Sequence, residues 1–159
     1  MTAFQTPPQS EIGTARPQLL PIDAPGIAGV RRIIGYLIGA NVNQTSTDLP
    51  CPLLLAPGQN FVITGFTLNN ASTSLTTATM SLYTAAAAGG TAIVSDAAVS
   101  ALTSSTKHLA MTIASGGTGN IWTNNSTSLG TAGYLYPRVG TAQGAAATVD
   151  IWIWGEVYL

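Results

Sequence analysis

The sequence predicts an all-β protein: a single β-sandwich, jelly-roll-like in architecture, preceded by an extended N-terminal arm. Three observations lead to this prediction. From Arg31 onward, short apolar runs alternate with turn clusters rich in Gly, Asn and Ser. Eight of the nine prolines lie within residues 1–57, so the chain is divided into two parts of different composition. The length of 159 residues suits one domain with a substantial core.

Residues 1–29 are predicted to form the arm. This segment carries prolines at positions 7, 8, 17, 21 and 25, which exclude helix interiors and central strands. A disordered tail is one interpretation, and a segment that docks on a neighbouring molecule is the other. Docking is favoured because disordered tails are usually poor in apolar residues. The apolar residues spaced along the arm are Phe4, Ile12, Leu19, Leu20, Ile22 and Ile27.

The body, residues 30–159, is expected to contain eight strands. They are predicted near residues 32–42, 52–56, 60–70, 77–85, 107–114, 119–123, 133–140 and 148–158. Short strands at fairly regular spacing indicate a sandwich or barrel rather than alternating strands and helices. A count of eight favours a jelly roll. The alanine-rich stretch 96–106 is the one place where a short helical turn is considered, although its caps are poor.

The last predicted strand, residues 148–159, alternates with a period of two. One face is aliphatic and is expected to line the core; its residues are Val149, Ile151, Ile153, Val157 and Leu159. The other face places Trp152 and Trp154 between the carboxylates Asp150 and Glu156, with Tyr158 following Glu156. This face either packs beneath a loop or the arm, contacts another subunit, or stacks on sugars. We take a subunit contact as the hypothesis, because Trp and Tyr are enriched at interfaces.

Residues suited to catalysis or metal binding are scarce. His108, the sole histidine, is expected to point outward from its strand, where a surface role is the ordinary one. Cys51, the sole cysteine, is interpreted as a small, semi-buried apolar residue. One His and one Cys cannot supply a usual metal site. We therefore expect no enzyme, no cofactor and no metal.

The six carboxylates are widely dispersed along the sequence. Asp150 and Glu156 share a strand face but lie six residues apart, which is about 20 Å along a strand. A glycosidase pair needs less than about 10 Å. Arg31 and Arg32, at the junction of arm and body, are interpreted as a solvated basic pair, with anchoring against an acidic patch of the capsid as the alternative.

The charge content is unusually low. Charged residues make up 7% of the chain, against about 25% in ordinary globular proteins, and the net charge is −1. Weak electrostatic repulsion favours association between copies. Five scattered Lys and Arg residues give no nucleic-acid footprint, and no apolar stretch is long enough to span a bilayer. The absence of a visible secretory signal predicts synthesis in a reducing cytoplasm.

Two segments carry a resemblance to a known family. Residues 74–96, followed by 100–114, contain a Tyr-Thr-Ala-Ala strand end, a Gly-Gly-Thr-Ala run and a Ser-Ala-Leu-Thr run. Residues 140–157 contain a Thr-Ala-Gln-Gly-Ala-Ala-Ala-Thr run that leads into the last strand. Both segments resemble small Ala/Thr-rich virion proteins of tailed bacteriophages. The sequence departs from them at 85–88, where a lysine is common, and at 115–133, which is longer; the arm has no counterpart.

The resemblance implies a structural virion protein with a β-sandwich body. We expect a decoration or cement protein on the outer capsid surface, assembled in the bacterial host cytoplasm, that bridges subunits of the major capsid protein. It is expected to form a homotrimer through Trp152, Trp154 and Tyr158. Residues of the arm are expected to bind the capsid: Phe4, Ile12, Leu19, Leu20 and Ile22. The alternative is a fibre or tail receptor-binding module whose β-sandwich contacts host glycans.

Overall fold

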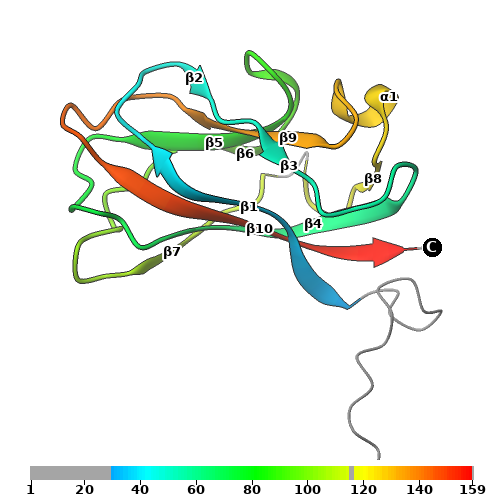
Figure 1. Cartoon of the computed structure of the whole chain (residues 1–159), viewed down its shortest axis with the longest axis horizontal. Helices are drawn as coiled ribbons and strands as arrows, with labels where there is room; N and C mark the ends of the chain where they lie inside the picture. Colours follow the sequence, from blue (N-terminus) through cyan, green and yellow to red (C-terminus); the bar gives the residue numbers. More distant parts are fainter. Residues whose placement is uncertain (1–29, 115–116, 159) are drawn as a thin grey trace, which may run out of the picture.

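The computed structural model describes residues 30–114 and 117–158, and these residues form two antiparallel sheets packed face to face (Figure 1). The predicted all-β sandwich is confirmed. The capsid-binding residues predicted in the arm, and Leu159, lie outside the described residues. The elements are β1 (Arg31–Asn41), β2 (Thr47–Asp48), β3 (Cys51–Pro52), β4 (Asn60–Asn69), β5 (Thr79–Ala85), β6 (Gly89–Ala98), β7 (His108–Met111), β8 (Ile121–Thr123), α1 (Ser126–Leu129), β9 (Tyr134–Val139) and β10 (Thr148–Tyr158).

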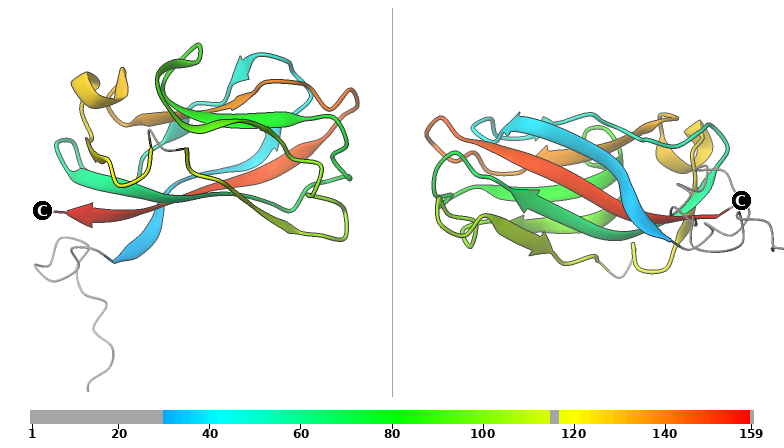
Figure 2. Two further views of the ribbon diagram at one scale, coloured as in Figure 1. Left: turned by 180° about the vertical axis from the view of Figure 1, so that it is seen from behind. Right: turned by 60° about the horizontal axis from the view of Figure 1, so that its bottom comes forward.

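The strand order is that of a jelly roll. Sheet A runs β1-β10-β4-β7, with β8 also paired to β4, and sheet B runs β2-β9-β5-β6, with β3 beside β9. Without the short β3 and β8, the strands form four antiparallel pairs: β1 with β10, β2 with β9, β4 with β7, and β5 with β6. Each sheet holds two of these pairs, as in a long hairpin rolled into a double sheet. Figure 2 shows the two layers from behind and β1 lying along β10.

The core fills the space between the two sheets. In β10, every second residue from Val149 to Val157 is buried and the residues between them are half-buried, which confirms the predicted alternation. Phe66 and Leu68 of the neighbouring β4 are fully buried, as are Met80 and Leu82 of β5 in the opposite sheet. Burying one such side chain stabilises the fold by about 1.5–3 kcal/mol.

Strand β6 differs from the sequence prediction. Residues 89–98 form a ten-residue strand. The stretch 96–106, where a helical turn was considered, contains no helix but a single hydrogen-bonded turn from Val99 to Leu102. Alanine has a low strand propensity, so the local sequence of β6 indicates a strand only weakly. The strand forms because it pairs with β5, with Thr79 opposite Ala98 and Leu82 opposite Val94.

Strand β3 is shorter than the strand predicted at 52–56, and the helix lies outside the stretch 96–106 where one was considered. The strand expected at 52–56 is reduced to Cys51–Pro52 and a bridge between Gly35 and Leu53. Prolines at 50, 52 and 57 cannot donate a ladder hydrogen bond, which limits its length. Within residues 30–114 and 117–158 the helix is α1, where the Asn125 side chain accepts a hydrogen bond from Ser128 N at 2.8 Å. No helix of this described part is long and apolar enough to cross a membrane.

Candidate binding face on sheet A

The outer side of sheet A carries aromatic and apolar side chains, where a solvated sheet face is normally polar. One row across four neighbouring strands consists of Tyr36, Trp152, Thr67 and Ala110. The large apolar side chains exposed on this side are Tyr36 at 48%, Ile38 at 66% and Ile121 at 67%. We call this surface the aromatic face, defined by Tyr36, Ile38, Ile121, Trp152 and Trp154.

The three aromatic residues predicted from the last strand lie on one side of β10. Trp152 and Trp154 meet edge to face, with ring centroids 6.1 Å apart and planes at 64°. Tyr158 lies at the end of the strand, and its hydroxyl donates to Glu156 Oε2 at 2.9 Å. That hydrogen bond, together with slight desolvation and the nearby carboxylate charge, raises the pKa of Tyr158 above its usual value. The structure therefore brings together the two tryptophans, while Tyr158 interacts chiefly with Glu156.

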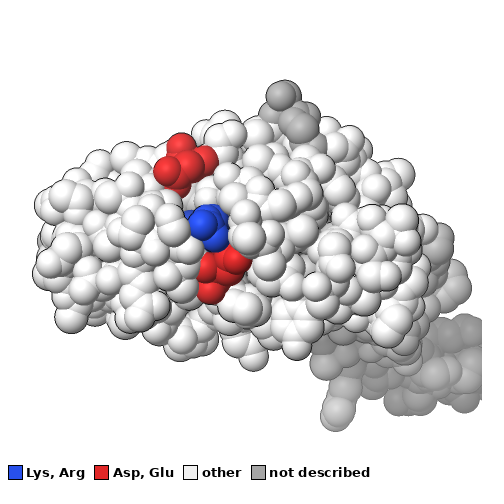
Figure 3. Space-filling model, turned by 90° about the horizontal axis from the view of Figure 1, so that it is seen from above, with Lys and Arg blue, Asp and Glu red and all other residues white. Residues whose placement is uncertain are grey.

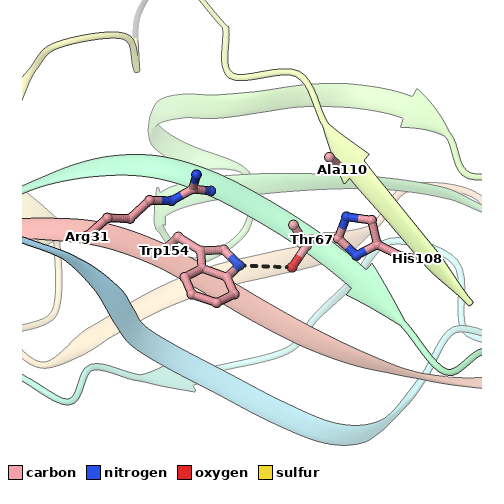
Figure 4. Close-up of a pocket in the computed structure, with 5 residues that line it drawn as sticks. All are labelled: Arg31, Thr67, His108, Ala110 and Trp154. Atoms are coloured by element: carbon pink, nitrogen blue, oxygen red, sulfur yellow. Dashed lines mark hydrogen bonds between the residues drawn. The ribbon is translucent and has the colours of Figure 1, made fainter.

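A shallow pocket of about 300 Å³ opens within this face. It is lined by Arg31, Thr67, His108, Ala110 and Trp154, which come from β1, β4, β7 and β10 (Figure 4). His108 is exposed, as predicted, but it borders this pocket rather than open solvent alone.

The floor of the pocket is a connected set of hydrogen bonds centred on Thr67. The Thr67 hydroxyl accepts from Trp154 Nε1 at 3.1 Å and from Asn69 Nδ2 at 3.4 Å, and donates to the Trp152 carbonyl at 3.5 Å. A hydroxyl has one donor and two acceptor positions, so all three are used. Thr67 is 5% exposed and holds the Trp154 ring in one orientation.

The same hydrogen bonds fix the tautomer of His108. Because Asn69 Nδ2 donates to Thr67, the Asn69 Oδ1 atom faces the imidazole, 2.7 Å from His108 Nδ1. An amide oxygen only accepts, so Nδ1 carries the hydrogen. The neutral ring therefore has Nε2 as its hydrogen-bond acceptor.

Arg31 and Arg32 do not form the solvated pair expected from the sequence. The Arg31 guanidinium stacks on Trp154, 5.3 Å from the ring centroid, and passes so close to Gly65 that a Cβ there would lie 2.8 Å from Arg31 Nη2. Arg32 lies opposite Gly155, and its terminal nitrogens are buried without a hydrogen-bond partner in the described structure. Consecutive residues of a strand point to opposite faces, which separates the two side chains.

Arg31 is the exposed cation of the aromatic face. Its neighbour across the ladder, Glu156, accepts the hydrogen bond from Tyr158. Among the described residues the ion pair present is Arg138–Asp48, on sheet B. The guanidinium of Arg31 is therefore stacked and held, with its charge not matched by a carboxylate of the described chain.

Sheet B has a different surface. Its strands carry three charged residues, Asp48, Asp96 and Arg138, of which two form the ion pair. Figure 3 shows the molecule from this side, with acidic and basic side chains confined to one small cluster on an otherwise uncharged surface. Tyr134 of β9 is exposed at 40%, whereas the aromatic face carries three large exposed apolar side chains, Tyr36, Ile38 and Ile121.

Sequence reasoning missed Arg31 and Thr67 as pocket residues and Asn69 as their hydrogen-bonded neighbour. These residues meet through the pairing of β1, β10, β4 and β7, and none belongs to a local motif. In the described ranges no cluster of three or more His, Cys, Asp or Glu side chains is arranged to hold a metal ion. No protein-family model matches the chain, and neither the curated proteins nor the solved structures contain a significant match to it.

Proposed function

We propose that this chain is a structural virion protein, a decoration or cement subunit that binds the outer head surface of a tailed bacteriophage and bridges capsid subunits. The aromatic face is the observation that carries the proposal. Contiguous exposed apolar surface on a soluble domain marks an interaction site. Trp and Tyr at the centre of such a surface supply most of the binding energy when they are buried by a partner.

Low charge supports the same role. A cement subunit functions in an assembled lattice, where copies lie close to one another and to the capsid protein. A net charge of −1 and 7% charged residues leave little long-range repulsion between copies. Contacts of this kind form through shape and apolar burial rather than through charge.

The partners of the proposal are the major capsid protein and further copies of the chain. Residues 1–29 contact the capsid, through the apolar side chains named above, and the aromatic face provides the contact between copies. Each specific contact requires about 1,000 Å² or more of buried surface. A long arm and a broad sheet face together offer that area without a deep binding site.

A glycan-binding fibre module is the second candidate, favoured by a tryptophan-lined pocket of about 300 Å³. Sugar stacking needs an open aromatic ring, and Arg31 already covers the Trp154 ring. The sequence hypothesis of a sugar platform is therefore the weaker of the two. Glycan-array binding that depends on Trp152 or Trp154 would favour the fibre.

The test of the proposed function is the copy number of the protein in purified virions, measured by quantitative mass spectrometry against the major capsid protein. A cement subunit is expected at a ratio approaching that of the capsid protein. A handful of copies would place the protein at a vertex, tail or fibre. Absence from the particle would contradict any virion role.

A further inference from the structure

We propose that the aromatic face binds the same face of a second copy of this chain, across a twofold axis that crosses the strands at the level of Trp152. This inference rests on the proposed role of the aromatic face as a contact surface and specifies its partner and geometry. It replaces the homotrimer expected from the sequence with an isologous dimer, because a surface that packs onto itself requires a twofold axis.

The first argument is the placement of charge on the face. The Arg31 guanidinium lies over Trp154 and Gly65, on one side of the Trp152 row. Asp150, a residue of β10 like Trp152, lies on the other side of that row. Trp154, over which the guanidinium lies, and Asp150 are each two residues from Trp152, about 7 Å along the strand. The cation and the carboxylate thus lie on opposite sides of the centre of the face.

The second argument is that one twofold axis pairs these charges and the other does not. An axis perpendicular to the strands reverses the strand direction, so Arg31 of one copy faces Asp150 of the second copy, twice. An axis parallel to the strands keeps each row opposite itself, so Asp150 then faces Asp150 of the second copy, and Arg31 faces the row that holds both Arg31 and Glu156. Like charges brought together cost several kcal/mol, so the perpendicular axis is preferred.

The third argument is that both charged groups are already held in place. Asp150 Oδ1 accepts from Gly39 N at 2.9 Å, and Oδ2 accepts from Asn70 Nδ2 at 2.8 Å. Each carboxylate oxygen retains a free lone pair, so the group can still receive a guanidinium. Arg31 is held by stacking on Trp154. Groups ordered before binding lose little entropy when the contact forms.

The centre of the contact is aromatic. In the perpendicular arrangement the Trp152 row faces itself, so Tyr36 and Trp152 of one copy pack on those of the second copy. Sheets packed face to face lie about 10 Å apart, a gap that side chains of this size fill. The exposed 48% of Tyr36 and 66% of Ile38 would then be removed from water.

The extent of the face sets the expected affinity. Three strands about 30 Å long and the four-residue β7, spaced about 4.8 Å apart, give roughly 500 Å² per copy, below the roughly 800 Å² of a standard interface. We therefore expect a reversible dimer with a Kd in the micromolar range. Contacts with the capsid lattice would strengthen it by raising the effective concentration.

The experiment is sedimentation equilibrium of the full chain over a wide concentration range. The wild type is expected to approach twice the 16.2 kDa of one chain. Asp150→Asn removes the charge and keeps an acceptor for Gly39 N, although it also replaces the oxygen that accepts from Asn70 Nδ2. Arg31→Gln removes the cation. Each is expected to raise the dimer Kd at least tenfold. The matched control is Asp96→Asn on sheet B, which should leave the Kd unchanged.

Two further variants separate charge pairing from other effects. The double variant Arg31→Asp/Asp150→Arg exchanges the charges and should recover most of the affinity that either single reversal loses. Gly65→Ala keeps every charge but places a Cβ 2.8 Å from Arg31 Nη2, so it should displace the guanidinium and weaken the dimer. Higher salt should weaken the wild-type dimer more than the Asp150→Asn dimer, because exposed ion pairs are screened.

Three results would overturn the twofold contact: a monomer at every concentration, an assembly of three chains, or a dimer whose Kd is unaffected by Asp150→Asn and Arg31→Gln. These outcomes are separable from the fate of the proposed function. A chain that is abundant on virions but never dimerises retains the cement role and loses this contact. A chain that dimerises as described but is absent from virions loses the cement role alone.

Discussion

The thiol of Cys51 lies in the core beside Gly35 of β1. The residue is fully buried, and a Cβ on Gly35 would come within 3.1 Å of Cys51 Sγ. Burial raises the pKa of this thiol from 9.0 to about 12, because a thiolate is poorly solvated in apolar surroundings. The semi-buried apolar residue expected from the sequence is thus a fully buried, unreactive thiol.

This pKa shift makes stability depend on pH in the alkaline range. Below pH 9 the thiol is protonated in both the folded and the unfolded state, and its contribution is complete. Between pH 9 and about 12 only the unfolded chain loses the proton, so the free energy of unfolding falls by about 1.4 kcal/mol per pH unit from this group. Urea denaturation at pH 8–11 should show this slope in the wild type and a shallower one in Cys51→Ala. Equal slopes would mean that the thiol titrates alike in both states.

For the candidate site, the sequence alone predicted which residues lie together only when they belong to the same strand. Trp152 and Trp154 share a face because they are two positions apart, and the sequence alone predicts this. Thr67 and Trp154 are 87 residues apart, and Asn69 and His108 are 39 apart. Their contacts depend on the register between strands, which no local pattern encodes.

At the scale of elements, predictability followed the strength of alternation. Strands β4 and β10 have long runs in which buried and outward residues alternate over much of their length, and both were predicted within one residue of their bounds. Strand β6 was missed, because the alanines that it contains carry little preference for a strand. Its conformation is imposed by the partner β5, which is a tertiary effect.

Gly155 shows how closely β10 packs between its neighbours. A Cβ at this position would lie 2.6 Å from Ile34 Cδ1 and 2.7 Å from the Val62 carbonyl oxygen. The carbonyl belongs to the backbone of β4 and cannot move without disturbing the sheet. Gly155→Ala is therefore expected to lower the free energy of unfolding by about 1–3 kcal/mol, measured by urea denaturation.

Gly65→Ala, in the adjacent strand, is the control for that prediction. Its nearest neighbour, at 2.8 Å, is the end of the flexible Arg31 side chain, which can swing away. A clearly smaller loss of stability is expected than for Gly155→Ala. Similar losses at both sites would indicate that the cost arises from replacing a strand glycine as such rather than from the Val62 carbonyl.

At the scale of the whole molecule, one core accounts for the body. The buried apolar cluster extends from Ile34 to Val157 and draws on both sheets. The jelly roll was favoured from the strand count, whereas three of the four pairings that define it join segments far apart in the chain; the fourth, β5 with β6, is a hairpin. The virion role was inferred from a resemblance and from the scarcity of residues suited to catalysis or metal binding. The aromatic face adds a physical reason for the proposed assembly.

Removal of residues 1–29 should separate folding from capsid binding. Because the core cluster lies within the body, the truncated protein is expected to unfold within a few degrees of the full chain, as measured by calorimetry. Binding to undecorated capsids should be lost, as measured by cosedimentation. Normal decoration by the truncated protein would show that the arm does not hold the capsid.

The pairing of β1 with β10 also determines how the molecule responds to force. The two strands are antiparallel, with Arg31 opposite Glu156, so the start of β1 and the end of β10 lie at the same edge of the sheet. Tension between these two ends would open the ladder one hydrogen bond at a time, as a zipper opens. Tension between the start of β1 and the start of β10, at Thr148, would instead load many bonds of the ladder together in shear.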